Sequence, residues 1–162
     1  MTGAGCWLSF DVACPVEHAF TVWTSGIGTW WPRDHTVSGQ PGLTVVLQGR
    51  VGGRIYERTA DGAEQDWGQV TVWEPPARLA YQWHLGRGPD EYTEVNIFFR
   101  AEGAAATRIE IEHAGWERLG NAAGVWRDRN QAGWESLLPH FLTAITRGDS
   151  SWPLAAGTTR GC

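Results

Sequence analysis

The chain has 162 residues, 42% of them hydrophobic, and a formal charge of −5, which fits one globular domain with its own core. Acidic and basic residues are interspersed, so the concentrated basic face that a phosphate backbone requires is missing, and nucleic acid is not expected as a partner. No apolar run approaches the roughly 20 residues of a membrane span, and the N-terminus does not resemble a leader. We therefore expect a cytoplasmic protein that does not insert into membranes.

Residues 7–13 alternate between apolar and polar side chains, which predicts a half-buried first strand. Pro15 stands where a helix can begin, and apolar residues recur at helical spacing from there to about residue 24. A second short helical or irregular piece is expected around residues 29–32, where Pro32 ends it. The chain thus begins with one strand and two short helices.

Short segments of period two follow, which indicates an antiparallel meander. Turn residues separate six expected strands, at 43–50, 53–59, 66–74, 78–85, 91–100 and 106–113. Alternation predicts one inward face and one solvent face for the last three. The inward candidates are Leu79, Tyr81, Trp83, Val95, Ile97, Phe99, Ile109, Ile111 and His113.

An apolar stripe at steps of three and four residues predicts one long helix from about 122 to 147. Pro139 lies within it and should bend it. Residues 149–162 show no periodicity, so we expect a flexible tail, in which Trp152 could still dock, behind one domain at 1–148. The fold class is α+β: a curved antiparallel sheet of about seven strands must wrap around the long helix to bury both apolar surfaces.

Several segments, in this order and spacing, resemble the activator-of-heat-shock-protein-90-ATPase homologue family of the START-like (Bet v 1-like, SRPBCC) superfamily. They are Ala19-Phe20, Trp30-Trp31, Val51-Gly52-Gly53, Gly68-Gln69-Val70, Trp73-Glu74-Pro75-Pro76, Leu79, Trp83, Thr93-Glu94-Val95, Thr107-Arg108-Ile109, His113-Ala114-Gly115-Trp116 and the Trp134 helix. The resemblance covers about residues 7–146 and implies a helix-grip fold with a deep cavity between sheet and long helix. It does not by itself imply an activity.

No motif of a nucleophilic enzyme, a metal site or a phosphate-binding loop is recognisable, and neither a metal nor a cofactor is expected. Cys6, Cys14 and Cys162 have neither zinc nor disulfide spacing, so reduced thiols are expected. His113 is the one catalytic candidate, because strand parity points it inward and an imidazole titrates near neutrality. A structural hydrogen bond is the favoured alternative for this residue.

The 11 tryptophans either build a bulky core or line a cavity. Tyr81, Trp83 and Trp134 should face one another across the gap between sheet and helix. For Glu57 a solvated position is favoured over a cavity position, and for Asn130 the two are balanced. The full set of candidate ligand contacts is Trp31, Glu57, Trp67, Tyr81, Trp83, Val95, Ile97, His113, Trp116, Asn130, Trp134 and Leu138.

The leading hypothesis is a binding protein that carries, senses or sequesters a small lipophilic or aromatic molecule in this cavity. The first alternative is an enzyme resembling polyketide cyclases and dehydratases, in which His113 or a cavity carboxylate moves a proton. The lesser alternative is a protein-interaction domain that uses the outer sheet face or Trp30-Trp31-Pro32; a chaperone partner is not expected. Monomer and homodimer both remain open.

Overall fold

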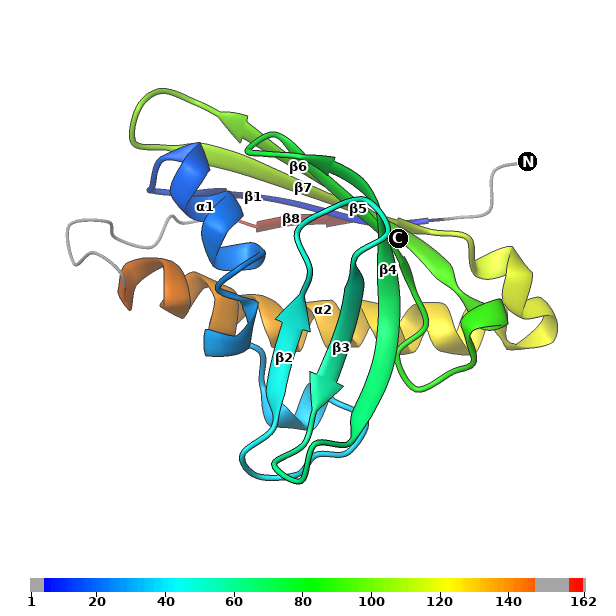
Figure 1. The fold of residues 1–162 in the computed structure, drawn as a ribbon. Helices are drawn as coiled ribbons and strands as arrows, with labels where there is room; N and C mark the ends of the chain where they lie inside the picture. The colour runs from blue at the N-terminus through cyan, green and yellow to red at the C-terminus, as the bar shows by residue number, and fades with distance from the viewer. Residues whose placement is uncertain (1–4, 148–157, 162) are drawn as a thin grey trace.

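A computed structural model describes residues 5–147 and 158–161 of the chain. One antiparallel sheet curls around a long C-terminal helix (Figure 1). In chain order the strands are β1 (Cys6–Val12), β2 (Thr44–Leu47), β3 (Arg54–Arg58), β4 (Glu64–Glu74), β5 (Arg78–Trp83), β6 (Thr93–Ala101), β7 (Thr107–Ala114) and β8 (Thr158–Gly161). Their order across the sheet is β2-β3-β4-β5-β6-β7-β1-β8, so the α+β helix-grip prediction is confirmed.

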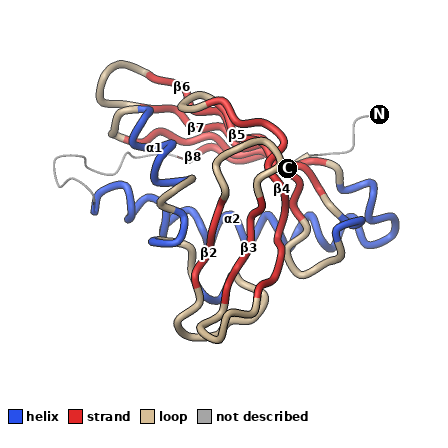
Figure 2. Tube along the Cα trace, in the orientation of Figure 1, coloured by secondary structure: helices blue, strands red, loops and turns tan. Residues whose placement is uncertain are grey.

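The helices and 3₁₀ turns lie between β1 and β2, between β5 and β6, and after β7 (Figure 2). They are α1 (Val16–Trp23), the 3₁₀ turns η1 (Ile27–Thr29), η2 (Arg33–His35), η3 (Pro89–Glu91) and η4 (Trp116–Ala122), and α2 (Ala123–Arg147). The second short helix expected around residues 29–32 is corrected to two single turns, one on each side of Trp30-Trp31. The indole of Trp30 explains the break, because its Nε1 donates 2.7 Å to the carbonyl of Val22 and ties the segment back to α1.

The alternation of apolar and polar residues correctly predicted the inward faces of the central strands, because every inward candidate on β5, β6 and β7 is buried. Two irregularities give the sheet its curl, at Ile55/Tyr56 between β3 and β4 and at Val70/Val72 between β4 and β5. Gly68 lies between them, and a Cβ there would come within 2.0 Å of the Gln82 carbonyl oxygen. The strands can approach this closely only because residue 68 is a glycine.

β8 is a second correction, because Thr158–Gly161 pairs with β1 although the whole tail was expected to be loose. Without it, the free edge of β1 would expose unpaired N–H and C=O groups, which a short added strand satisfies. The sheet consequently has eight strands instead of about seven. Trp152 lies outside the described residues.

The core fills the space between the concave face of the sheet, α1 and the second half of α2. Trp23 is central to it, because its ring packs against those of Trp30, Trp134 and Phe141 at centroid distances of 4.8 to 6.1 Å. Trp30 is 5% exposed, so the exposed apolar patch considered for Trp30-Trp31-Pro32 does not form there. The indoles close most of the hollow that a curved sheet would otherwise leave.

Candidate functional site

A large open space begins where α2 leaves the core. All six buried residues of this helix lie at or after Trp134, so its first three turns extend beyond the packed interior. Between these turns, η2 and the end of β5 lies a cavity mouth of about 540 Å³. Its walls are Asp34, His35, Thr36, Val37, Leu85, Gly86, Trp126, Arg129, Asn130, Ala132 and Gly133.

A smaller and more apolar space of about 50 Å³ continues from the mouth toward the core. It shares His35, Leu85, Asn130 and Gly133 with the mouth, and is closed by Trp31, Trp83, Trp134 and Leu137. Gly133 helps to keep the passage open, because a Cβ at this position would meet no atom within 4 Å. The two spaces therefore adjoin, with polar groups in the walls of the outer one and indoles in the walls of the inner one. They are called the cavity below.

Glu57 holds the rim of the mouth in place. Its carboxylate accepts hydrogen bonds from the backbone N–H groups of Val37 and Ser38 at 2.7 and 2.8 Å, and from the Trp67 indole at 2.9 Å. The side chain is fully buried, so the favoured solvated position for Glu57 was wrong. Three donors compensate the burial of this carboxylate, and they tie the segment after η2 to the sheet.

His113 sits at the centre of a fully satisfied polar network. Trp134 Nε1 donates to His113 Nδ1 at 3.1 Å, which leaves the ring proton on Nε2, and Nε2 donates 2.7 Å to Thr93 Oγ1. Thr93 in turn donates to the carbonyl of Trp83 at 3.2 Å. Burial, and secondarily the charge of Arg87, lowers the pKa of His113 to about 3, so its imidazole stays neutral. Its two ring nitrogens thus orient Trp134 and Thr93.

β7 ends beside this network in a turn that needs a glycine. Gly115 has a φ of 87°, and the turn brings Trp116 into contact with His113. Trp116 Nε1 donates to the His113 carbonyl at 3.0 Å, and the two rings lie 4.3 Å apart. Trp116 thereby contacts His113 through both its ring and its indole N–H.

Tyr81 contributes a further polar group to the interior. It is 3% exposed, and burial raises its pKa, an effect partly offset by the nearby indole N–H of Trp23. That N–H does not reach hydrogen-bond geometry with any described residue. The Tyr81 ring packs 5.5 Å from that of Trp83, which connects it to the inner wall of the cavity.

Four of the twelve candidate contacts line the cavity: Trp31, Trp83, Asn130 and Trp134. The other eight lie in the core behind its walls, namely Glu57, Trp67, Tyr81, Val95, Ile97, His113, Trp116 and Leu138. Asn130 directs its amide N–H to the Trp126 carbonyl at 2.8 Å, one turn earlier in α2. Sequence reasoning had not singled out as ligand contacts Asp34, His35, Leu85, Trp126, Arg129 or Gly133, although a glycine within a helix signals a need for space.

Residues 13–147 match the family described as "Activator of Hsp90 ATPase homolog 1-like protein". The chain belongs to this family. The resemblance seen in the sequence is therefore confirmed, and the helix-grip fold agrees with it. Within the described residues no helix could cross a membrane, and no group of three His, Cys, Asp or Glu side chains is placed to hold a metal ion. No curated protein sequence matches the chain.

Several solved structures of this fold are similar to the family member described here. An anthrahydroquino-Gama-pyrone synthase, Txn09, is 36% identical with a TM-score of 0.55, over 75% of this chain and 83% of that one. The self-sacrificing resistance protein CalC from Micromonospora echinospora is 30% identical with a TM-score of 0.69, over 90% and 96%. PFC0360w, an HSP90 activator from Plasmodium falciparum, is 19% identical with a TM-score of 0.63, over 94% and 100%, a likeness of fold alone.

Proposed function

We propose that the chain binds a small hydrophobic molecule with a planar aromatic body, and carries, senses or sequesters it in the cytoplasm. The observation that supports this best is the pair of adjoining spaces, a mouth of about 540 Å³ and a smaller inner space lined by Trp31, Trp83 and Trp134. Concave sites of this size, mostly apolar with a few polar groups, are typical of small-molecule binding. Indole rings suit planar ligands because they offer flat, polarisable faces.

The relatives support the same proposal. One structure that is 36% identical is named as a synthase of an anthrahydroquino-Gama-pyrone and is complexed with a molecule designated SUM, and one that is 30% identical is a resistance protein. The name of the first refers to a polycyclic aromatic compound. The family's own name refers to an ATPase activator, but the likeness to the HSP90 activator concerns the fold, so a co-chaperone role is not proposed.

Tryptophan fluorescence provides the test, with the neutral compound anthraquinone-2-carboxamide as the probe. The wild type should show saturable quenching, because the ring system would lie against three indoles. Gly133→Leu should weaken binding at least about tenfold, since a side chain at this position enters the cavity while meeting no backbone. Gly124→Leu is the matched control, because Gly124 lies on the same helix, away from the cavity walls and with open space around it.

Absence of saturable quenching in the wild type contradicts the proposal. Equal affinities of the wild type and Gly133→Leu would place the ligand elsewhere and would contradict it as well. Circular dichroism of both variants verifies that α2 is retained.

Catalysis in the same cavity is the second candidate, favoured by the 36% identity to a synthase. Asp34 and His35 are the acid–base groups that line the cavity, whereas both ring nitrogens of His113 are engaged within the core. If the chain turns over a polyketide-like substrate, His35→Ala should abolish turnover while binding is mostly kept. Turnover unaffected by His35→Ala would refute the role assigned to this residue.

A further inference from the structure

Two arginines meet at one indole in the mouth of the cavity. The guanidinium carbon of Arg87 lies 4.6 Å from the centre of the Trp126 ring, and that of Arg129 lies 5.1 Å from it. Arg87 comes from the loop after β5, and Arg129 and Trp126 come from the first two turns of α2. The cation–π contacts hold both positive charges beside the cavity, where Trp126 and Arg129 form part of its wall.

Neither arginine forms an ion pair with a carboxylate of the described residues, although the charge of Glu91 acts on Arg87 from a greater distance. Arg87 donates to the carbonyls of Glu91 and Trp83 at 3.0 and 3.1 Å, and Arg129 contacts the indole of Trp126. Asp34 lines the mouth but forms no ion pair with a described residue. Six other arginines pair with carboxylates: Arg54, Arg58, Arg100, Arg108, Arg118 and Arg127. Arg33, Arg50, Arg78 and Arg147 form no ion pair among the described residues either, so the mouth differs from them in holding two arginines on one ring.

The two charges also repel each other. Burial lowers the pKa of Arg87, Glu91 counteracts this effect, and the neighbouring charge of Arg129 lowers the pKa further. A counter-charge near both arginines would offset this repulsion. Two positive charges therefore share one indole at the mouth of the cavity, although the net charge of the chain is −5.

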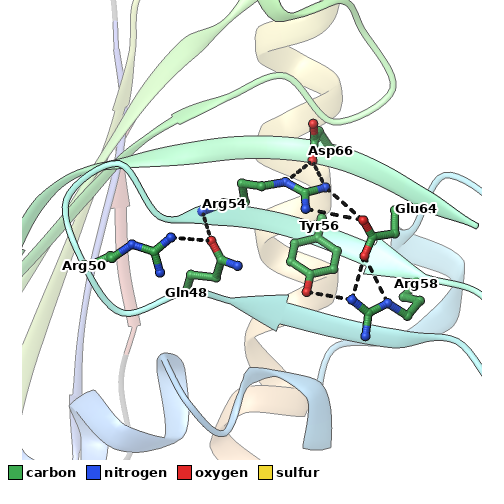
Figure 3. Close-up of polar contacts among 7 residues, drawn as sticks. All are labelled: Gln48, Arg50, Arg54, Tyr56, Arg58, Glu64 and Asp66. Carbon is green, nitrogen blue, oxygen red and sulfur yellow. Dashed lines mark hydrogen bonds and ion pairs between the residues drawn. The ribbon is translucent and has the colours of Figure 1, made fainter. Parts of the chain in front are cut away.

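On the outer face of β3 and β4, a similar cluster of two arginines and an aromatic ring is paired with carboxylates. There Arg54 and Arg58 lie 4.3 and 5.5 Å from the centre of the Tyr56 ring. Glu64 bridges both arginines and Asp66 binds Arg54 at 2.6 Å (Figure 3). The mouth of the cavity repeats the two arginines and the aromatic ring, but no described carboxylate forms an ion pair with these arginines.

We propose that the ligand supplies this missing carboxylate, so that the cavity selects aromatic acids, with the acid group at Arg129 and the ring system toward Trp31, Trp83 and Trp134. This inference rests on the proposed function, because it assigns the two ends of the ligand to the two ends of the cavity. Arg129 and Gly133 are one helical turn apart, about 6 Å along α2. A carboxylate attached directly to a fused ring system spans this separation.

The test compares anthraquinone-2-carboxylate with anthraquinone-2-carboxamide, which share shape and ring system but differ in charge. Wild-type protein should bind the acid at least about tenfold more tightly, because a charge-assisted hydrogen bond to arginine is stronger than a neutral one. Arg129→Gln should abolish this preference while it retains the affinity for the amide. Arg127→Gln is the matched control, because Arg127 pairs with Asp128 outside the cavity wall and should leave the preference intact.

Equal affinities of the wild type for acid and amide would overturn the inference and leave the proposed function standing. Retention of the preference in Arg129→Gln would likewise overturn it, since the acid would then be recognised elsewhere. Failure of both compounds to bind would overturn the proposed function and the inference together. A preference that weakens with added salt in the wild type, and is absent from Arg129→Gln at every salt concentration, supports the inference.

Discussion

The mouth of the cavity and the outer face of β3 and β4 are built from similar parts but differ in their charge balance. Each places two arginines on one aromatic ring, Trp126 in the mouth and Tyr56 on the sheet. On the sheet, Glu64 and Asp66 form ion pairs with the two arginines, whereas in the mouth no described carboxylate forms an ion pair with Arg87 or Arg129. In a cluster that only stabilises the fold, carboxylates of the same chain can pair with the arginines. In a site that binds an acidic ligand, the arginines must stay unpaired until the ligand binds.

In the interior behind the mouth, as in the cluster on the sheet, the polar groups have partners within the chain. Glu57 and His113 are both fully buried, and each hydrogen-bonding atom of these two side chains has a partner. These groups position the rim and the inner wall without facing the cavity. Polar groups with hydrogen-bond partners therefore lie in the interior, and arginines without an ion pair lie at the mouth. Three substitutions test this contrast.

The largest effect is expected from Glu57→Ala, which removes the acceptor of three buried donors. We expect a loss of about 3 kcal/mol in the free energy of unfolding, measured by urea denaturation, since each orphaned donor retains its desolvation cost. Glu64→Ala is the control on the exposed cluster, and its effect should be far smaller, because surface pairs contribute little. Similar losses in both variants would refute the distinction between the rim anchor and the surface cluster.

His113→Phe should cost about 2 kcal/mol near neutral pH, because Trp134 and Thr93 lose their shared partner. Its pH dependence is more specific. The native pKa of about 3 lies below the unfolded value of about 6.5, so the stabilising contribution is complete above pH 6.5 and declines as the pH falls toward 3. The wild type should therefore lose roughly 2–3 kcal/mol more than His113→Phe between about pH 7 and 4.5. Parallel pH profiles would show that His113 is not held neutral by burial.

The third and smallest change makes the mouth resemble the sheet cluster. Ala132 lines the mouth, is exposed, and lies three residues after Arg129, so Ala132→Glu brings a carboxylate within reach of that arginine. Affinity for anthraquinone-2-carboxylate should fall about tenfold, because the new side chain competes with the ligand and repels it. Ala132→Gln controls for size and should bind nearly as well as the wild type. Undiminished affinity in Ala132→Glu would contradict the assignment of the acid group to this end of the cavity.

Much of the fold could be predicted from the chain itself, because alternation and helical spacing are local signals. The inward faces of β5, β6 and β7 and the start of α2 were found within one or two residues. β8 could not be found, since its reason to form is the open edge of β1, about 150 residues away. Pairings of this kind depend on tertiary context and leave no period in the tail.

The candidate site was only partly accessible to sequence reasoning. Parity on β3 places Glu57 with inward-facing Ile55, but a buried carboxylate is plausible only once its donors are known. These donors come from residues 37 and 38, whose position relative to β3 no local pattern reveals. The mouth escaped notice for the same reason, because Asp34, Leu85 and Arg129 converge from three separate segments.

A crystal structure of the chain with anthraquinone-2-carboxylate would show where the acid group and the ring system bind. We expect the ring system between Gly133 and the indoles of Trp31, Trp83 and Trp134, with the carboxylate within hydrogen-bond distance of Arg129. A ligand bound on the outer face of the sheet, or bound in the cavity with its carboxylate pointing toward the indoles, would contradict this expectation.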